Sequence, residues 1–381
     1  MLQARKAGIS LDWKASTKRE DPERFPPLTG VEGACETEHI HGISLPANVY
    51  PMFENSLRRI YGDDHATHQQ KIGELMSSLT RVASQNPLAW FRDILAPEEI
   101  ITVTPENRNT AFPYTKRMNA MLFVNQSAAL VVTSQEQADR MGIARSKRVY
   151  LHGYAEAHDH WNVLSREEYG VSPAIRVVAQ KALGDAGKTI EEIDFFDLYS
   201  CFPVSVQVTR DMLGIPADDP RPLSVTGGLP YFGGPGNNYV MHSMAQMVQL
   251  LRANPGKFGL VTGNSFYMTK HSTAVCSTEP LHGPLNIINS SECQQHVDSL
   301  PARQINPEPS GPAVVDTYTV VYNRENEPQT GIVIGTTRDG RRFAAYTPAD
   351  RDLLVSMTQE EFYGVKGTVI SKEKVNTFTP D

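Results

Sequence analysis

The sequence has no long apolar run, no clustered cysteines and no excess of basic residues. Its most apolar stretch, residues 121–132, is interrupted by Asn125, Gln126 and Ser127. A membrane-spanning helix needs roughly 18 consecutive apolar residues, and the first residues lack the apolar core of a secretory signal. We therefore expect a cytoplasmic protein without a membrane span.

Positive charge is in the minority. The chain has 36 Lys plus Arg against 43 Asp plus Glu, which gives a net charge of -7. Nucleic acids and anionic membranes attract proteins through an excess of positive charge. The composition therefore disfavours both as general partners.

Metal and disulfide frameworks are also poorly supported. The four cysteines, Cys35, Cys201, Cys276 and Cys293, lie far apart without a C-x-x-C pair. Zinc sites need at least three protein ligands, and the His158-Asp159-His160 run has no further Cys or His near it. We expect no metal, and a polar loop at residues 158–160.

Helical spacing of apolar residues runs through 51–82, with Gly62 as the break between two helices. Residues 121–134 are small and β-branched and predict a strand buried on both faces. Ser134 is then the expected N-cap of a short helix that ends near Gly142.

From residue 148 onward strands and helices alternate. The expected strands are 148–157, 195–202 and 258–264, and the expected helices are 172–186, 204–213 and 239–253. This alternation predicts a layered α/β domain with a largely buried sheet. Ligands of such sheets bind where strands lead into helices.

The chain changes character after residue 283, where five prolines up to Pro312 predict a linker. Short strands are then expected at 314–324, 331–337, 341–347 and 366–371, with a helix at 348–362. Several strands and one helix in so short a segment predict a small five-stranded barrel of the OB type.

Three loops of the α/β region are candidate sites. In the first, Cys201 precedes a helix, where the helix dipole favours a thiolate. The alternative is that Cys201 is a small core residue.

The second loop, residues 227–238, has five glycines and leads into a helix that carries His242. Its backbone can approach a ligand closely, and a helix N-terminus favours an anion or a polarised carbonyl. The alternative is a tight connection without a ligand.

The third loop, residues 262–271, ends in Lys270 and His271. These side chains can bind phosphates or transfer protons. The alternative is that they are merely solvated.

Five segments carry a resemblance to a known family. They are SLPANVYPMFENSLR (44–58), NRNTAFPYTKRMNA (107–120), DLYSCFPVSVQ (197–207), VTGGLPYFGGPGNNYVMHS (225–243) and TGNSFYMTKHSTAVCSTEP (262–280). The chain resembles the thiolase superfamily, specifically the thiolase-like proteins related to sterol-carrier-protein-X thiolase, which are commonly labelled acetyl-CoA acetyltransferases.

The resemblance implies two similar α/β halves that bind acyl-CoA at their junction. Met1 corresponds to a point well inside the N-terminal half of such proteins, so we expect that half to be incomplete and its nucleophilic cysteine to be absent. The implied domains are residues 1–165 and 166–285, the two thiolase-like halves, then a linker at 286–312 and an OB-like barrel at 313–381.

Three positions differ from the thiolase pattern. Tyr199 stands where the sterol-carrier relatives have His, Gly233-Gly234-Pro235 replaces the GHP loop, and Thr262-Gly263-Asn264 lacks the second catalytic Cys. Standard thiolysis uses these groups to transfer protons. We therefore expect a non-standard mechanism or a partner chain.

The resemblance predicts an acyltransferase that acts on CoA thioesters in lipid metabolism, with no separate cofactor. The expected catalytic residues are Tyr199, Cys201 and His242. The expected substrate- or CoA-binding residues are Gly233, Gly234, Asn237, Asn238, Gly263, Asn264, Lys270 and His271. The expected partners are acyl-CoA and either a second copy or an OB-fold or thiolase partner chain.

Two alternatives stay open. The first is a catalytically silent acyl-CoA-binding or scaffold protein. The second is nucleic-acid binding by the barrel through its basic residues, with Phe343 and Tyr346 as stacking aromatics. The basic residues are Arg338, Arg341, Arg342 and Lys366.

Overall fold

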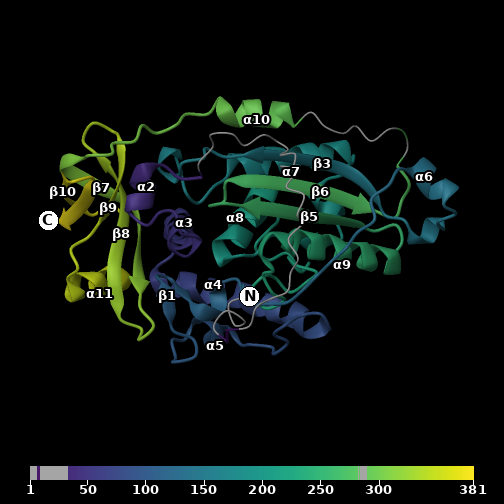
Figure 1. Cartoon of the computed structure of the whole chain (residues 1–381), viewed down its shortest axis with the longest axis horizontal. Helices are drawn as coiled ribbons and strands as arrows, with labels where there is room; N and C mark the ends of the chain where they lie inside the picture. Colours follow the sequence, from purple (N-terminus) through teal and green to yellow (C-terminus); the bar gives the residue numbers. More distant parts are fainter. Residues whose placement is uncertain (1–6, 9–32, 282, 284–289) are drawn as a thin grey trace. The chain divides into compact units, whose positions relative to one another are not determined.

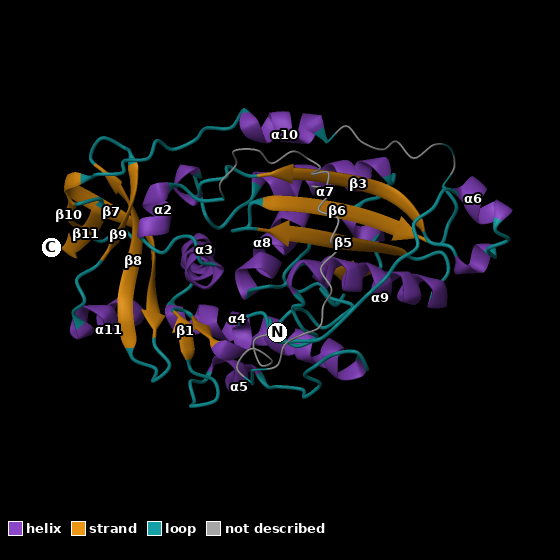
Figure 2. Cartoon of the chain, viewed as in Figure 1, coloured by secondary structure: helices purple, strands orange, loops and turns teal. Residues whose placement is uncertain are grey.

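Two β-sheets organise the part of the chain that the structure describes (Figures 1 and 2). The structure is a computed structural model and describes residues 7–8, 33–281, 283 and 290–381. Within Gly33–Asp381, one sheet has four strands and the other has seven.

The four-stranded sheet has the order β3-β6-β5-β4. Its strands are β3 (Tyr150–His158), β4 (Phe195–Asp197), β5 (Phe258–Ser265) and β6 (Lys270–Ser277). β4 runs parallel to β5, whereas β5, β6 and β3 are antiparallel neighbours. The strand at 148–157 and the strand at 258–264 are confirmed, but only three residues of 195–202 are in a strand.

Helices cover both faces of this sheet. They are α7 (Pro173–Asp185), α8 (Pro203–Leu213) and α9 (Tyr239–Ala253). Leu260 of β5 packs in the core formed with α7 and α8, and the next residue, Val261, packs against α9. Alternate strand residues point to opposite faces, so the predicted layered α/β/α arrangement is confirmed.

The helix boundaries follow local signals. The side chain of Ser172 accepts a hydrogen bond from the backbone of Ile175 and caps α7, and Ser134 caps the short helix α6 (Gln135–Arg140) as predicted. None of the helices in the described ranges is both long and apolar enough to cross a membrane.

The helices nearest the N-terminus of the described chain are α2 (Glu36–Ile40), α3 (Pro46–Tyr61), α4 (His65–Gln85) and α5 (Pro97–Ile101). Gly62 ends α3 in the left-handed conformation with φ of 69°, which is the predicted break between two helices. α3 packs on both α8 and β7, so it joins the α/β region to the barrel.

The barrel consists of five strands that close on themselves. They are β7 (Ser310–Tyr322), β8 (Pro328–Thr337), β9 (Arg342–Tyr346), β11 (Val375–Pro380) and β10 (Lys366–Lys372), and β10 pairs back with β7. Helix α11 (Arg351–Gln359) packs on β7 and β8. The short strands β1 (Asn109–Ala111) and β2 (Tyr114–Thr115) extend the sheet from β7. The predicted five-stranded barrel is confirmed.

Strand β11 was not among the strands expected individually. It forms a hairpin with β10, in which Lys372 pairs with Val375. The two turn residues, Glu373 and Lys374, have φ of 51° and 67°. Such turns usually contain Asn or Gly, so the sequence carried no turn signal here.

The predicted linker contains a docked helix. Helix α10 (Ser291–Asp298) packs on β3 and α7, with Cys293 and Val297 buried. These two residues lie four apart on one helix face, which the proline-rich composition obscured. Residues 286–289 of the linker lie outside the described residues, and the predicted domain boundaries stay predictions.

The strand expected at residues 121–134 is wrong. Residues 121–133 form no strand, and Phe123, Val131 and Val132 are 76%, 87% and 91% exposed. Met121 forms backbone hydrogen bonds with Leu229 and Gly234. No other backbone hydrogen bond joins this segment to the rest of the described chain. A strand needs a neighbouring strand to pair with, and composition cannot supply one.

Candidate functional site

Cys201 lies in the turn between β4 and α8, among hydroxyl and amide groups. The Tyr50 and Ser205 hydroxyls face its thiol. Asn264 of β5 donates from Nδ2 to the Tyr50 hydroxyl at 3.2 Å and to Ser205 Oγ at 3.1 Å. Side chains from α3, α8 and β5 therefore meet at this cysteine.

The thiol of Cys201 is not activated. Burial raises the pKa of Cys201 to about 12, although the Tyr50 and Ser205 hydroxyls oppose this shift. The expected thiolate is therefore contradicted, because the loss of hydration outweighs a helix-dipole effect of roughly 1 kcal/mol. Cys201 is a buried neutral thiol.

Two glycines of the second loop are explained by the backbone conformation and the packing around them. Gly227 has φ of 106°, and a Cβ there would lie 2.6 Å from the Cα of Ala83. Gly233 has φ of 126°, and a Cβ there would lie 2.5 Å from Gln126 Oε1. At these positions the glycines serve tight packing against α4 and the 121–126 segment. A ligand-binding role for Gly233 and Gly234 stays a prediction.

His242 lies in the first turn of α9, which directly follows the second loop. Its Nε2 is 3.3 Å from Nδ2 of Asn238, and its ring makes an edge contact with Phe232 at 5.5 Å between centroids. Burial lowers the pKa of His242, so the imidazole is neutral at pH 7 and available as a base. Asn237 is exposed.

The residues expected in the third loop are mostly in strands. Gly263 and Asn264 belong to β5, in agreement with the strand expected at 258–264, whereas Lys270 and His271 belong to β6, so the predicted loop is wrong for these two residues. Asn264 and His271 are direct cross-strand partners. His271 is buried with Nε2 3.5 Å from Asp159, so its present position does not reach an external phosphate.

Asn264 and His271 line a narrow crevice between the sheet and helices α7 and α8. The crevice is too narrow for a water molecule as it stands. His271 Nε2 and Asn264 Oδ1 have no hydrogen-bond partner within the described residues. Lys270 lies outside this crevice, with Nζ 5.1 Å from the Phe266 ring centroid.

The predicted site residues fall into two groups. Cys201 and Asn264 lie with α8, whereas His242 belongs to α9, which covers the opposite face of the sheet. Tyr199 lies near both groups, because its ring contacts that of Tyr239 on α9 at 5.5 Å and it is two residues before Cys201 in the same turn. Burial raises the pKa of Tyr199, so its hydroxyl is a neutral donor.

Asp197 holds the helix that carries His242 to β4, although the sequence singled out only its neighbours. Its buried carboxylate accepts hydrogen bonds from Ser243 at 2.7 Å and Tyr239 at 3.2 Å on α9. It also accepts from Ser224 Oγ at 2.9 Å and the Thr226 amide at 3.2 Å. One side chain thus holds together β4, the start of the second loop and the helix that carries His242.

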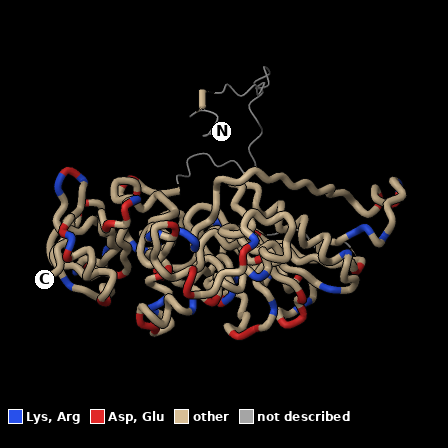
Figure 3. Tube along the Cα trace, turned by 90° about the horizontal axis from the view of Figure 1, so that it is seen from below, with Lys and Arg blue, Asp and Glu red and all other residues tan. Residues whose placement is uncertain are grey.

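The barrel does not present the surface expected for nucleic-acid binding. Phe343 is fully buried, and Arg342 is buried and forms an ion pair with Asp316 at 3.3 Å. The Tyr346 hydroxyl donates to the carbonyl of Ile40. Basic and acidic residues are interspersed along the described trace (Figure 3). The stacking platform is therefore absent from the described barrel strands.

No group of three or more metal-ligating side chains is assembled within the described ranges. In the His158-Asp159-His160 run, Asp159 is buried and accepts hydrogen bonds from Ser172 Oγ and the Ala174 amide at the start of α7. This aspartate is a helix-capping residue.

Comparison with known proteins decides the family. Residues 292–374 match the family described as the thiolase-like protein type 1 additional C-terminal domain. A monomeric SCP2-thiolase-like protein type 1 from Mycobacterium smegmatis is 37% identical, with a TM-score of 0.86 over 92% of this chain and 76% of that one. The chain belongs to the SCP2-thiolase-like proteins of the thiolase superfamily.

More distant relatives agree with this thiolase-superfamily assignment. Acetyl-CoA acetyltransferase 1 of Arabidopsis thaliana is 27% identical over 144 residues, which are 38% of this chain and 32% of that protein. Acetyl-CoA acetyltransferase IA of Candida tropicalis is 25% identical over 155 residues, 41% of this chain and 34% of that protein. The matched region spans about a third of the length of these curated relatives.

The fold also occurs in a solved aldolase assembly. The structure of the Ltp2-ChsH2(DUF35) aldolase has a TM-score of 0.51 over 66% of this chain and 70% of that one. At 19% identity the likeness is one of fold alone.

Proposed function

We propose that this SCP2-thiolase-like chain binds an acyl-CoA thioester in the cytoplasm and takes part in acyl transfer in lipid metabolism. The observation that supports this proposal is that polar groups of Tyr50, Ser205 and Asn264 surround Cys201 at the start of α8. The two hydroxyls donate to the carbonyls of Phe266 and Tyr199, and a thioester carbonyl oxygen at this helix N-terminus would take the place of those acceptors. The CoA thioester is the substrate, and the proposal needs no other cofactor.

The mechanism differs from standard thiolysis. Cys201 is a protonated thiol and His242 is a neutral base that comes from the other face of the sheet. Tyr199 is a neutral hydroxyl donor whose ring contacts Tyr239, at the start of the helix that carries His242. Turnover would require a rearrangement that brings a base to Cys201, or a partner chain that supplies the missing group.

A second candidate is a catalytically silent acyl-CoA-binding protein. The specific observation in its favour is the burial that raises the pKa of the Cys201 thiol to about 12. A site of this kind would hold the thioester without attacking it.

Calorimetric titration with acetyl-CoA and with palmitoyl-CoA tests acyl-CoA binding, which both candidate functions require. The same samples should be assayed for free CoA with a thiol reagent, with Cys201→Ala as the variant and Cys276→Ala as the matched control. Binding with turnover lost only in Cys201→Ala supports the transferase, and binding without turnover supports the silent protein. Absence of binding by a folded sample contradicts both.

The oligomeric state is proposed separately. The Mycobacterium smegmatis relative is described as monomeric, and the aldolase structure is named for two components, Ltp2 and ChsH2(DUF35). We propose that this chain is a monomer in isolation. We also propose that a partner chain that supplies the missing catalytic group binds at the exposed loops beside the site. Light scattering after size exclusion tests the first part, and a stable dimer would contradict it.

A further inference from the structure

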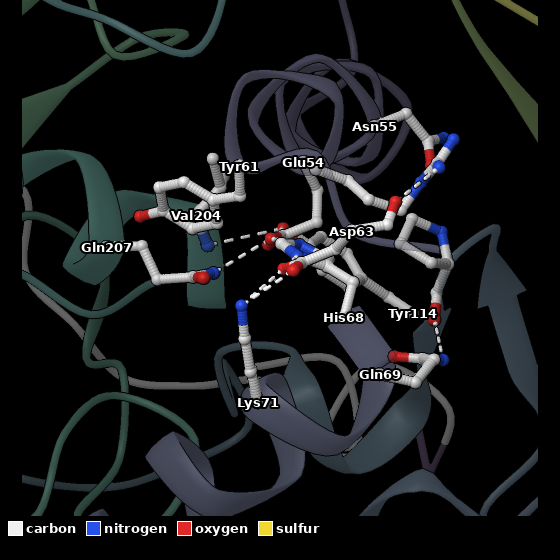
Figure 4. Close-up of polar contacts among 12 residues, drawn as sticks. Glu54, Asn55, Tyr61, Asp63, His68, Gln69, Lys71, Tyr114, Val204 and Gln207 are labelled. Atoms are coloured by element: carbon white, nitrogen blue, oxygen red, sulfur yellow. Dashed lines mark hydrogen bonds and ion pairs between the residues drawn. The ribbon is translucent and has the colours of Figure 1, made fainter. Parts of the chain in front are cut away.

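Glu54 of α3 carries a fully buried carboxylate that three other elements share (Figure 4). Its Oε1 lies 2.6 Å from Nε2 of His68 on α4 and accepts a hydrogen bond of 2.8 Å from Nε2 of Gln207 on α8. Its Oε2 accepts a hydrogen bond of 2.6 Å from the Tyr114 hydroxyl of β2. A buried carboxylate with three donors ties these four elements together.

His68 lies between two carboxylates. Its Nε2 faces Glu54, and its Nδ1 is 3.2 Å from Oδ2 of Asp63. Asp63 in turn forms an ion pair with Lys71, at 2.7 Å and 2.8 Å, and Lys71 is 50% exposed at the surface. A neutral imidazole has one N–H and can donate to only one carboxylate, whereas the imidazolium donates to both.

This cluster reaches the candidate site through Tyr114. The Tyr114 hydroxyl accepts a hydrogen bond of 3.3 Å from the amide of Val204 in the first turn of α8. The Tyr114 ring stacks on Phe202 with 5.8 Å between centroids. Phe202 follows Cys201 directly, so the Glu54 carboxylate supports the turn that carries the cysteine.

We propose that Glu54 and His68 are positioning residues for the candidate site, and that the hydrogen bonds shared by the Glu54 carboxylate with His68, Gln207 and Tyr114 hold the Cys201 turn in place. The inference depends on the proposed function only in taking acyl-CoA as the ligand of the candidate site. Removal of the Glu54 charge weakens these hydrogen bonds and therefore weakens the hold on α8.

Other charged and titratable groups surround Glu54 and His68 and contribute to the electrostatic potential at these two side chains. They are Tyr61, Asp211 and Arg210 on the α8 side, Arg58 with Glu361 on the barrel side, and His65. None of these is changed in the test, so their contribution is common to all samples.

The test measures modification of Cys201 by iodoacetamide relative to Cys276, quantified by mass spectrometry at one fixed pH. Cys276 is buried in β6 with its pKa raised to about 12, so it reports general unfolding. The variant is Glu54→Gln, which keeps the size and removes the charge. The matched control is Glu74→Gln, an exposed position on α4.

We expect Glu54→Gln to raise the Cys201 to Cys276 ratio by on the order of tenfold, the effect of one lost charged hydrogen bond. The ratio in Glu74→Gln should match that in the unchanged protein. Equal acceleration of both cysteines, or an unchanged ratio, would overturn the proposal.

If Glu54→Gln does not fold, His68→Gln takes its place, because it keeps the carboxylate and removes the ring. Acetyl-CoA binding is measured on the same samples by calorimetry. Failure of the unchanged protein to bind overturns the proposed function, whereas an unchanged cysteine ratio overturns the positioning role, so the two failures are distinguishable.

Discussion

Asp197 on β4 accepts a hydrogen bond of 2.7 Å from Ser243 on α9, and this contact joins the helix that carries His242 to the end of the sheet. The same carboxylate caps the turn at residues 224–226 through side-chain and backbone donors. Loops that are far apart in the sequence are thus positioned by one buried group.

Asp197→Asn should destabilise the protein. The amide keeps the size of the side chain but presents a donor to Ser243, Ser224 and backbone amides that themselves donate. We expect the free energy of unfolding to fall by roughly 2–4 kcal/mol, measured by urea denaturation. Asp218→Asn, at an exposed position, is the control, and an equal effect in both variants would contradict the role of Asp197.

Stability should fall on acidification through His41. This buried ring has Nδ1 2.7 Å from the carbonyl of Thr37, and its Nε2 accepts a hydrogen bond of 2.8 Å from the amide of Asn376 in the barrel. Burial lowers the pKa of His41, against the opposing hydrogen bond to Thr37. The unfolded chain therefore binds a proton first as pH falls below about 6.5.

His41→Gln should consequently weaken the pH dependence of stability. We expect the slope of unfolding free energy between pH 6.5 and 5.5 to decrease by up to about 1.4 kcal/mol per pH unit, the value for one proton. Denaturant titrations at several pH values measure it, with the exposed His39→Gln as control. An identical slope in His41→Gln would be inconsistent with this assignment.

Cys201 should resist alkylation in the folded protein. Since burial raises its pKa to about 12, its thiolate fraction at neutral pH is on the order of a thousandfold below that of a free cysteine. Iodoacetamide labelling at pH 7.5 followed by mass spectrometry, compared with the urea-unfolded chain, measures this. Equal labelling rates in the two states would show an activated thiol.

Gly227→Ala should cost more stability than Gly236→Ala. Both residues have positive φ, 106° and 61° respectively, but a Cβ at 227 would lie within 3 Å of the Ala83 backbone, whereas at 236 it meets nothing within 4 Å. We expect a loss of roughly 1 kcal/mol at 236 from the left-handed conformation and roughly 3 kcal/mol at 227. Thermal melts of the two variants provide the comparison, and equal melting temperatures would rule out the packing explanation.

Local signals predicted much of the secondary structure. Ser172 with Pro173, and Gly62, are sufficient to begin or end helices because capping is decided by neighbouring residues. Strand β11 was missed because its turn at Glu373 and Lys374 contains none of the usual turn residues. The 121–134 segment has strand composition but no partner strand within the described ranges.

The candidate site was only partly predictable. Cys201 and Asn264 were identified from their motifs, and the fold brings them together around Tyr50. Glu54 and Asp197 lie within the motifs that carry the resemblance, but they were not predicted as site residues, because a buried carboxylate cannot be distinguished in sequence from a solvated one. Their importance follows only from the donors that the fold assembles around them.

The sequence by itself determined the family, the α/β layering, the terminal barrel and the helix boundaries, because these depend on periodicity, caps and motifs within short segments. The tertiary structure alone decided that Cys201 is a neutral thiol, that α9, the helix that carries His242, packs on the opposite face of the sheet, and that Glu54 and His68 support the Cys201 turn. Protonation and mutual placement depend on burial and on partners distant in the chain, which no local pattern specifies.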